Sequence, residues 1–231
     1  MASPIRNWRP ITTSPILTGS TSVSRYGFRP DRSRSRANTV CIPESSPPPR
    51  PELLMNLLQS RIVWEGKWRL RVDTFRLPDG SLYERGAIDH PGAVTIVPLL
   101  PGDPSPVVLM LRQYRPALGR TILELPAGTR EDGEPWLTCA QRELQEETGY
   151  RAETFHPLGE VWAAPGVTNE RMALFLANGL VADPRPMDFD EEIVVESWPL
   201  AELIDMALDG RLEDAKSVVA LLRAAQFLRA A

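Results

Sequence analysis

Four glutamates and one arginine gather in a short stretch near the middle of the chain, and their types suit the binding of a cation. Glu134 precedes Arg142 by eight residues, and Glu143, Glu146 and Glu147 follow directly. Carboxylates crowded together repel one another unless a positive charge joins them. Hard divalent cations such as Mg2+ take oxygen ligands of this kind and commonly bind substrate phosphates as well. An arginine can also hold one carboxylate in place through two hydrogen bonds.

A single predicted helix positions these side chains. Pro135 suits its first turn and Gly149 suits the position just past its end. Leu137, Ala140 and Leu144 recur at helical spacing and are predicted to face the core. The three glutamates that follow the arginine, three and four residues apart, share a different face. A solvated acidic surface is the alternative interpretation. Gly128 and Glu134, which precede the helix at fixed spacing, favour a cation-binding site over a solvated surface. A loop that returns the Glu134 carboxylate to the helix can support the cluster of carboxylates.

The charge is spread unevenly along the 231 residues. Residues 1–50 hold eight arginines against Asp31 and Glu44, a net charge of +6, so a total of −4 leaves −10 for the remaining 181 residues. An acidic body argues against nucleic acid as a partner and fits a protein that holds cations. Two cysteines are too few for a disulfide framework, and Cys139, inside the predicted helix, is interpreted as a buried free thiol. His90 and His156 are isolated and receive no metal role.

The chain divides into three predicted parts. Residues 1–50 are rich in serine, proline and arginine and cannot bury enough apolar surface to fold. We interpret them as a disordered tail, with an organelle transit peptide or upstream sequence translated from a misplaced start codon as the alternatives. Residues 51–90 form an antiparallel β subdomain and residues 91–231 the main domain. No run approaches the roughly 20 apolar residues of a membrane span, and a cytoplasmic location is expected.

Alternating patterns and turn signals predict the elements of the folded part. A hairpin joins residues 62–77 to residues 82–88 through the turn Pro78–Gly80. The nearly all-apolar strand at 93–100 is predicted to lie at the centre of a mixed sheet. The remaining predicted elements are strands at 107–114, 160–164, 172–177 and 193–198 and terminal helices at 199–208 and 214–229.

The stretch from Gly128 to Tyr150 as a whole fits the pattern G-x5-E-x7-R-E-U-x-E-E-x-G-U, in which U is a bulky apolar residue. This pattern is the Nudix box, and the chain therefore resembles the Nudix hydrolase superfamily. The resemblance implies a metal-dependent hydrolase of a nucleoside diphosphate linked to another group. It also implies an α/β fold, a Nudix α/β/α sandwich with a mixed sheet, here preceded by the small antiparallel β subdomain.

Four further stretches, from about residue 60 onward, resemble the ADP-ribose pyrophosphatase branch and favour ADP-ribose as the expected substrate. They are Glu65–Trp68 with Tyr83–Arg85, His90–Val94, Arg112–Pro116 leading to Glu124–Gly128, and Ala164–Glu170 with Asp188–Glu192. Pro165 lies 15 residues past the box, where this branch carries a marker proline. These motifs are less specific than the box.

The resemblance implies a set of metal ligands, with Mg2+ as the expected ion and Mn2+ as a possible substitute. The carbonyl of Ala127 and the side chains of Glu143 and Glu147 would bind it, Glu146 would assist, and Glu191 would close the site. A solvated loop position is the alternative for Glu191. The box residues Arg142, Glu143, Glu146 and Glu147, with Glu191, are the expected catalytic set.

The general base stays open at this point. Some relatives carry a glutamate that acts as the general base two residues before the position of Glu191. This chain has Phe189 at that position. The candidates for the base are Asp188, Asp190, Glu170 and Glu146.

The resemblance also implies residues that bind the substrate. Arg115, helped by Arg112, would contact a phosphate, and Trp68, Tyr83 and Glu84 would build a slot for adenine. Ordinary strand packing is an equal alternative for the two aromatic residues. The amino-terminal strands of this branch often exchange between subunits, so a homodimer is expected and the slot would span it.

The expected reaction is the hydrolysis of ADP-ribose to AMP and ribose 5-phosphate. A nucleotide sugar or a dinucleotide is the nearest alternative substrate, because the box contacts only the pyrophosphate. A non-hydrolysing ADP-ribose sensor is less favoured, since this chain keeps Glu143, Glu146 and Glu147. An enzyme for oxidised nucleoside triphosphates is disfavoured by the additional strands predicted between residues 60 and 90.

Overall fold

The computed structural model describes residues 55–102, 105–183 and 193–230. The predicted tail and the late acidic loop, including Glu191, Phe189 and the base candidates Asp188 and Asp190, lie outside these ranges. The strands are β1 (Asn56–Glu65), β2 (Arg69–Arg76), β3 (Leu82–Asp89), β4 (Ala93–Leu100), β5 (Val107–Arg115), β6 (Arg120–Glu124), β7 (Ala127–Thr129), β8 (Tyr150–Trp162), β9 (Arg171–Ala182) and β10 (Ile193–Pro199), and the helices are α1 (Trp136–Thr148), α2 (Leu200–Asp209) and α3 (Ala215–Ala230).

The small amino-terminal sheet has the order β1-β2-β3, and all its pairs are antiparallel. The predicted hairpin is confirmed as β2–β3, and its turn is held by the Ser81 N–H, which donates to Asp79 Oδ1 at 2.9 Å. The prediction of one continuous strand over 62–77 is wrong, because a turn at Gly66 separates β1 from β2. A Cβ atom on Gly66 would lie 2.3 Å from the Trp64 ring, so any other residue here would require the indole to move.

The main sheet follows the order β10-β5-β4-β9-β8, with β6 paired to β5 and β7 paired to β4. Its central strand is β4, as predicted, which runs antiparallel to β5 and parallel to β9. Six consecutive β4 residues, 93–98, are buried. A strand covered on both faces has no need to alternate apolar and polar side chains, which explains its continuous apolar sequence.

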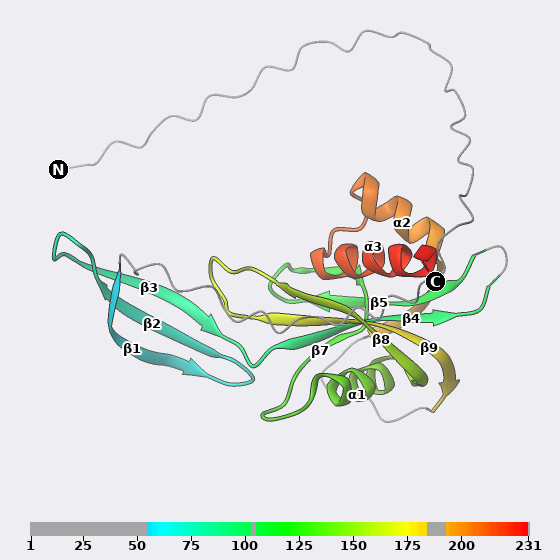
Figure 1. Ribbon diagram of the computed structural model, residues 1–231, viewed down its shortest axis with the longest axis horizontal. Helices are drawn as coiled ribbons and strands as arrows, with labels where there is room; N and C mark the ends of the chain where they lie inside the picture. The colour runs from blue at the N-terminus through cyan, green and yellow to red at the C-terminus, as the bar shows by residue number, and fades with distance from the viewer. Residues whose placement is uncertain (1–54, 103–104, 184–192, 231) are drawn as a thin grey trace, which may run out of the picture. The chain divides into compact units, whose positions relative to one another are not determined.

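Helices cover both faces of the main sheet, α1 on one side and α2 with α3 on the other (Figure 1). On the α1 side, Cys139, Ala140 and Leu144 pack against Val94 and Ile96. The α3 side is the larger cluster and includes Val97, Met110, Leu174, Leu203 and Leu221. The predicted α/β/α sandwich with a mixed sheet is therefore confirmed, and so is the small antiparallel sheet that precedes it.

Two details of the predicted elements differ from the structure. Leu137 is 46 % exposed, so its predicted place in the core is wrong; in this first helical turn Trp136 packs against the apolar cluster instead. The strand predicted at 160–164 is the end of the much longer β8. Among the described residues, no helix combines the length and hydrophobicity needed to cross a membrane.

Hydrogen bonds tie the end of the small sheet to the loop between β8 and β9. The Arg85 guanidinium donates to the Gly166 carbonyl at 2.5 Å. The Asn169 side chain donates to Asp89 at 2.7 Å and accepts from the His90 N–H at 2.8 Å. These contacts fix the point at which the chain passes from β3 into β4 and bring the turn before β2 to the carboxylate-bearing side of the main domain.

Candidate active site

The carboxylates of the central motif are carried by helix α1, which ends at Gly149 as predicted but begins after Pro135, a residue predicted to lie in its first turn. Pro135, with φ −64° and ψ 144°, is the cap residue directly before the first helical residue. Gly149 ends the helix with φ 73°, a left-handed conformation that glycine adopts without steric cost. Its N–H donates to the Gln145 carbonyl at 3.0 Å. The helix presents its acidic side chains to a cleft and packs its apolar side on the sheet.

The Arg142 guanidinium joins three of the four carboxylates. It holds Glu134 through two hydrogen bonds of 3.0 Å, one from Nε and one from Nη2. Its Nη1 donates to Glu143 at 2.7 Å and to Glu146 at 3.0 Å, and Nη2 also donates to the Thr129 carbonyl at 3.2 Å. One cation therefore offsets the repulsion among carboxylates from the loop and from the helix. Hydrogen bonds to Glu134, opposed by burial, raise the pKa of Arg142.

Glu134 is the support that its spacing predicted. The hydrogen bonds from Arg142 lower its pKa from 4.5 to about 2, despite the opposing effect of burial. Its Oε2 also accepts from the Glu131 N–H at 3.0 Å, so the side chain braces the loop between β7 and α1. The folded state therefore stabilises the ionised form of Glu134.

A dependence of stability on pH follows for Glu134. A carboxyl group whose pKa is lowered by folding stabilises the protein above its unfolded pKa, and that contribution is lost as the pH falls towards the folded value. We expect Glu134→Gln to lower the free energy of unfolding at pH 7 by on the order of 1–2 kcal/mol. The difference from the wild type should shrink between pH 4.5 and about 2. Urea denaturation at a series of pH values would measure it, and a difference that stays constant over this window would contradict the prediction.

The close approach of β7 to α1 depends on Gly128. A Cβ atom at this position would lie 1.7 Å from the carboxyl carbon of Glu143 and about as close to its oxygens, at 2.0 and 2.1 Å. No side chain fits there while Glu143 keeps its position. The glycine at the start of the motif is therefore required by space, and it lets the Glu143 carboxylate lie directly against the backbone of β7.

Glu147 and Ala127 meet across the same gap. Glu147 is 5 % exposed, and its Oε2 accepts from the Ala127 N–H at 2.8 Å. In the β4–β7 ladder Ala127 pairs with Thr95, and next to them the Ile96 N–H donates to the Pro126 carbonyl. Hydrogen-bonded and non-hydrogen-bonded pairs alternate in antiparallel strands. The N–H and C=O groups of Ala127 therefore both point away from β4, on the side of the helix carboxylates.

The donor chemistry of this region suits a hard cation, although the ligand set is incomplete in the described ranges. Carboxylate oxygens of Glu143, Glu146 and Glu147 and a backbone carbonyl are the donors that Mg2+ takes. Within the described residues, no three His, Cys, Asp or Glu side chains converge into a group that could hold a metal ion. Two of the helix carboxylates are bonded to Arg142 instead. The expected ligand Glu191 falls outside those ranges.

A cleft of about 910 Å3 opens along these side chains. The predicted residues on its wall are Trp68, Arg115, Ala127, Arg142, Glu143, Glu146 and Glu147. Residues to which the sequence analysis assigned no site role line it as well: Lys67, Asp89, Pro91, Thr129, Arg130, Glu131 and Asp132, with His90. Lys67 belongs to the turn between β1 and β2, and no local pattern shows that such a turn reaches a site formed mainly by residues 115–147.

A second cleft, of about 530 Å3, shares Arg115, Ala127, Gly128 and Thr129 with the first. It extends towards Trp162, Glu170 and the start of α3 at Lys216. The base candidate Glu170 therefore lies on this second cleft, whereas Glu146 lies on the first. Arg115 and β7 form the junction at which the two clefts meet.

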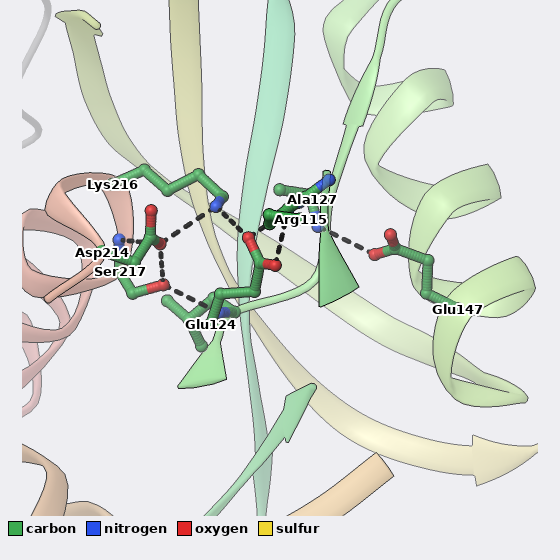
Figure 2. A network of polar contacts seen from close by, with 8 residues as sticks. Arg115, Glu124, Ala127, Glu147, Asp214, Lys216 and Ser217 are labelled. Carbon is green, nitrogen blue, oxygen red and sulfur yellow. Dashed lines mark hydrogen bonds and ion pairs between the residues drawn. The ribbon is translucent and has the colours of Figure 1, made fainter. Parts of the chain in front are cut away.

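Arg115 is held at this junction by a buried ion pair. Its Nε and Nη2 donate to the two oxygens of Glu124 at 2.8 and 2.7 Å, and Glu124 is 1 % exposed. Burial opposes the charge, but the hydrogen bonds to Glu124 prevail and raise the pKa of Arg115. Figure 2 shows Arg115 beside Ala127, between the helix carboxylate Glu147 and the start of α3.

The other predicted substrate residues are not gathered in one place. Arg112, on the opposite face of β5 from Arg115, donates to Glu196 on β10 at 2.6 Å and lines neither described cleft. Tyr83 and Glu84 are exposed on β3 and line neither cleft. Tyr83 pairs with Phe75, seven residues along the chain from Trp68. At about 3.3 Å per residue the two aromatic residues lie roughly 20 Å apart along the strand. Trp68 and Tyr83 of one subunit therefore do not lie together, and the adenine slot that spans a dimer stays a prediction.

The predicted burial of the free thiol is confirmed. Cys139 is fully buried on the sheet side of α1. Burial, with the nearby carboxylates of Glu134 and Glu143, raises the pKa of the Cys139 thiol to about 12. A thiol that stays protonated is a poor nucleophile, so Cys139 serves the packing of the helix.

This fold and this arrangement of helix carboxylates match a known family. The NUDIX domain family model matches residues 89–221. An ADP-ribose pyrophosphatase of Bacillus subtilis is 34 % identical over 154 residues, which cover 66 % of this chain and 82 % of that protein. An ADP-ribose pyrophosphatase of Mycobacterium tuberculosis is 36 % identical over 156 residues, covering 66 % and 74 %. A GDP-mannose pyrophosphatase of Cronobacter sakazakii is 30 % identical over 182 residues, covering 73 % and 94 %.

A solved structure supports the same fold. The crystal structure of an ADP compounds hydrolase aligns with a TM-score of 0.66 at 22 % identity, over 79 % of this chain and 98 % of that one. The chain therefore belongs to the NUDIX family and is a Nudix hydrolase. Enzymes of this family generally use divalent metal ions and act on small nucleotide compounds.

Proposed function

We propose that this protein hydrolyses the pyrophosphate bond of ADP-ribose, giving AMP and ribose 5-phosphate, with Mg2+ or Mn2+ as the cation. The observation that carries the proposal is the cleft on which Arg115 and the helix carboxylates Glu143, Glu146 and Glu147 lie together. Cationic and anionic groups side by side suit a substrate whose phosphates are bound partly by arginine and partly through a metal ion. The names of the two ADP-ribose pyrophosphatases support the choice of substrate.

Each residue on the cleft has a distinct task in the proposed reaction. Glu143, Glu147 and the Ala127 carbonyl hold the cation, with Glu191 as a further ligand from the late acidic loop. When bound there, the cation would lower the pKa of a water and offset charge on the phosphoryl oxygens. Arg142 keeps the helix carboxylates in place without touching the substrate.

Proton transfer and phosphate binding fall to two further side chains. Glu146, whose side chain is 31 % exposed on the wall of the first cleft, takes the proton of the attacking water. Of its two oxygens, Oε2 accepts from Arg142, so Oε1 is assigned to the water. Arg115 pairs with a phosphate oxygen and stabilises the charge that develops there.

A substrate panel tests this function. ADP-ribose, ADP-glucose, GDP-mannose, NADH and diadenosine compounds are each assayed with Mg2+ and with Mn2+, and the products are identified by chromatography. The proposal requires ADP-ribose to show the highest kcat/KM and to yield AMP. No hydrolysis of any compound with either metal would overturn it.

A nucleotide-sugar pyrophosphatase is the second candidate. The GDP-mannose pyrophosphatase noted above aligns over nearly all of its own length, whereas the two ADP-ribose pyrophosphatases align over less of theirs. In the same panel, a higher kcat/KM for GDP-mannose than for ADP-ribose would favour this candidate. The roles proposed for Arg115 and the helix carboxylates would be unchanged, because they concern only the pyrophosphate.

We further propose a homodimer in which the small sheets meet and complete the adenine slot. The sheet exposes several large apolar side chains: Leu57 52 %, Leu58 44 %, Ile62 54 %, Val63 43 %, Trp64 49 %, Leu82 65 % and Tyr83 43 %. Neighbouring residues of a strand point to opposite faces, so both faces of the sheet carry exposed apolar side chains, and such surface suits coverage by a partner. Two-fold pairing would also allow Trp68 of one subunit to approach Tyr83 and Glu84 of the other, which one subunit alone does not permit.

Replacing Trp68 tests the slot and the dimer together. Trp68→Ala should raise the KM for ADP-ribose several-fold with little change in kcat, because stacking is made in the ground state as well as in the transition state. Leu118→Ala, an exposed apolar position outside both described clefts, is the control and should leave KM unchanged.

Subunit complementation makes this test sharper. Coexpressing Trp68→Ala with Tyr83→Ala should restore normal KM to about a quarter of the slots, since in a symmetric dimer each mixed pair keeps one intact slot. An unchanged KM for Trp68→Ala would refute its stacking role. Two impaired variants that do not complement would refute the shared slot.

A further inference from the structure

A compact group of four charged side chains includes the buried Glu124, and it joins α3 to the cleft. Glu124 Oε2 accepts from Lys216 Nζ at 2.5 Å as well as from Arg115 Nη2 at 2.7 Å. Lys216 Nζ also donates to Asp214 Oδ2 at 3.0 Å. All of these except Arg115 are largely buried, with side-chain exposures of 1 % for Glu124, 14 % for Lys216 and 15 % for Asp214. Figure 2 shows the dashed contacts running from Asp214 through Lys216 and Glu124 to Arg115.

The start of α3 is anchored to the same stretch of chain by a second set of bonds. Asp214 Oδ2 accepts from the Ser217 N–H at 3.1 Å and from the Ser217 hydroxyl at 2.5 Å, which caps the helix. Ser217 Oγ in turn accepts from the Leu125 N–H at 2.7 Å. Lys216 therefore has a fixed position relative to Glu124, because the residues that directly follow them, Ser217 and Leu125, are hydrogen-bonded to each other.

The ion pair with Glu124 uses only part of the Arg115 guanidinium. Nε and one N–H of Nη2 donate to Glu124, out of the five N–H groups that an arginine carries. The side chain is 37 % exposed and lines both clefts at their junction. A bidentate pair fixes the plane of the guanidinium, so the position of Glu124 decides where the other N–H groups of Arg115 point.

We propose that Lys216 is a positioning residue that, by holding the Glu124 carboxylate, aims Arg115 at the substrate phosphate. The inference rests on the phosphate role proposed above for Arg115. Two cations balance one buried carboxylate, and Asp214 balances the second cation. Without Lys216, Glu124 keeps a single ion-pair partner and one fewer donor, so the carboxylate and the arginine fixed to it are free to shift. Displacements of about 1 Å in a catalytic group can reduce rates up to about a hundredfold.

The test uses variants that keep the size of the side chains. Lys216→Met should lower kcat/KM about tenfold on the compound that the wild type hydrolyses most efficiently in the panel. Lys216→Arg, which keeps the charge, should retain most of the wild-type kcat/KM. Glu124→Gln removes the carboxylate on which Lys216 acts, so it should lower kcat/KM to a similar extent. The double variant Lys216→Met/Glu124→Gln should be no worse than Glu124→Gln alone, because both changes break the same link.

Arg120→Met is a matched control for the loss of a cation. Arg120 pairs with Glu213 at 2.8 Å between β6 and the residues before α3, but both side chains are more than half exposed. Such surface pairs contribute little, so kcat/KM should stay at the wild-type value. Melting temperatures are measured for all variants, and kcat/KM is expressed per folded molecule.

The outcomes separate this inference from the proposed function. An impaired Arg115→Met together with a wild-type-like Lys216→Met overturns the role of Lys216 alone. Losses that multiply in the double variant overturn it as well, since Lys216 would then act independently of Glu124. So does a Lys216→Met loss that disappears when activity is expressed per folded molecule. An unimpaired Arg115→Met instead refutes the phosphate role of Arg115, and the inference falls with it.

Discussion

Replacing Glu147 with glutamine is expected to abolish most of the hydrolytic activity and leave the fold intact. The amide oxygen of glutamine can still accept the hydrogen bond from the Ala127 N–H, which is 2.8 Å from Glu147 Oε2. A neutral amide cannot replace a charged oxygen ligand of a divalent cation. We expect kcat/KM to fall roughly 10²- to 10³-fold, the range found when a preorganised electrostatic group is removed from an active site.

Steady-state assays across a range of Mg2+ concentrations, with thermal melting in the absence and in the presence of Mg2+, would measure this effect. Glu202→Gln, in the first turn of α2, is the matched control and should behave as the wild type. Glu147→Gln should also lose most of the rise in melting temperature that the metal causes in the wild type, because a ligand that binds the folded state stabilises it. Near wild-type turnover for Glu147→Gln would refute the metal-binding role proposed for this residue.

Replacing Gly128 with alanine should cause a comparable loss of activity for a different reason. The new Cβ atom would occupy the place of the Glu143 carboxyl group, whose carbon lies 1.7 Å from the ideal Cβ position. The end of a flexible side chain can move aside at small cost. The carboxylate should therefore leave its site while the strand and helix remain, and activity should fall at least a hundredfold with little change in melting temperature.

Gly86→Ala is the matched control, because no atom lies within 4 Å of the corresponding Cβ position. Both variants would be compared with the wild type by kcat/KM and by calorimetric unfolding. A Gly128→Ala enzyme with normal activity would show that the position of Glu143 against β7 is not needed for the reaction. A large loss of stability would show that the strand cannot tolerate the change, contrary to the expected displacement of a side chain.

Local patterns in the sequence determined the elements that carry the site. The helix between Pro135 and Gly149 follows from backbone preferences of those two residues, which act over one turn. The grouping of Arg142 with Glu143 and Glu146 follows from helical geometry, since residues three and four apart are neighbours. The central place of β4 follows from its continuous apolar sequence, which only a strand covered on both faces requires.

Tertiary structure alone decided several of the contacts between residues that are far apart in the chain. Glu124 and Lys216 are 92 residues apart, and nothing in either local sequence indicates that their side chains form an ion pair. Lys67 and Trp68 reach the cleft because a turn at Gly66 splits a run that reads as one strand. The separation of Trp68 from Tyr83 depends on the register of β2 with β3. Contacts of this kind arise from strand order and the packing of helices on the sheet, which act over the whole domain and leave no short-range pattern in the chain.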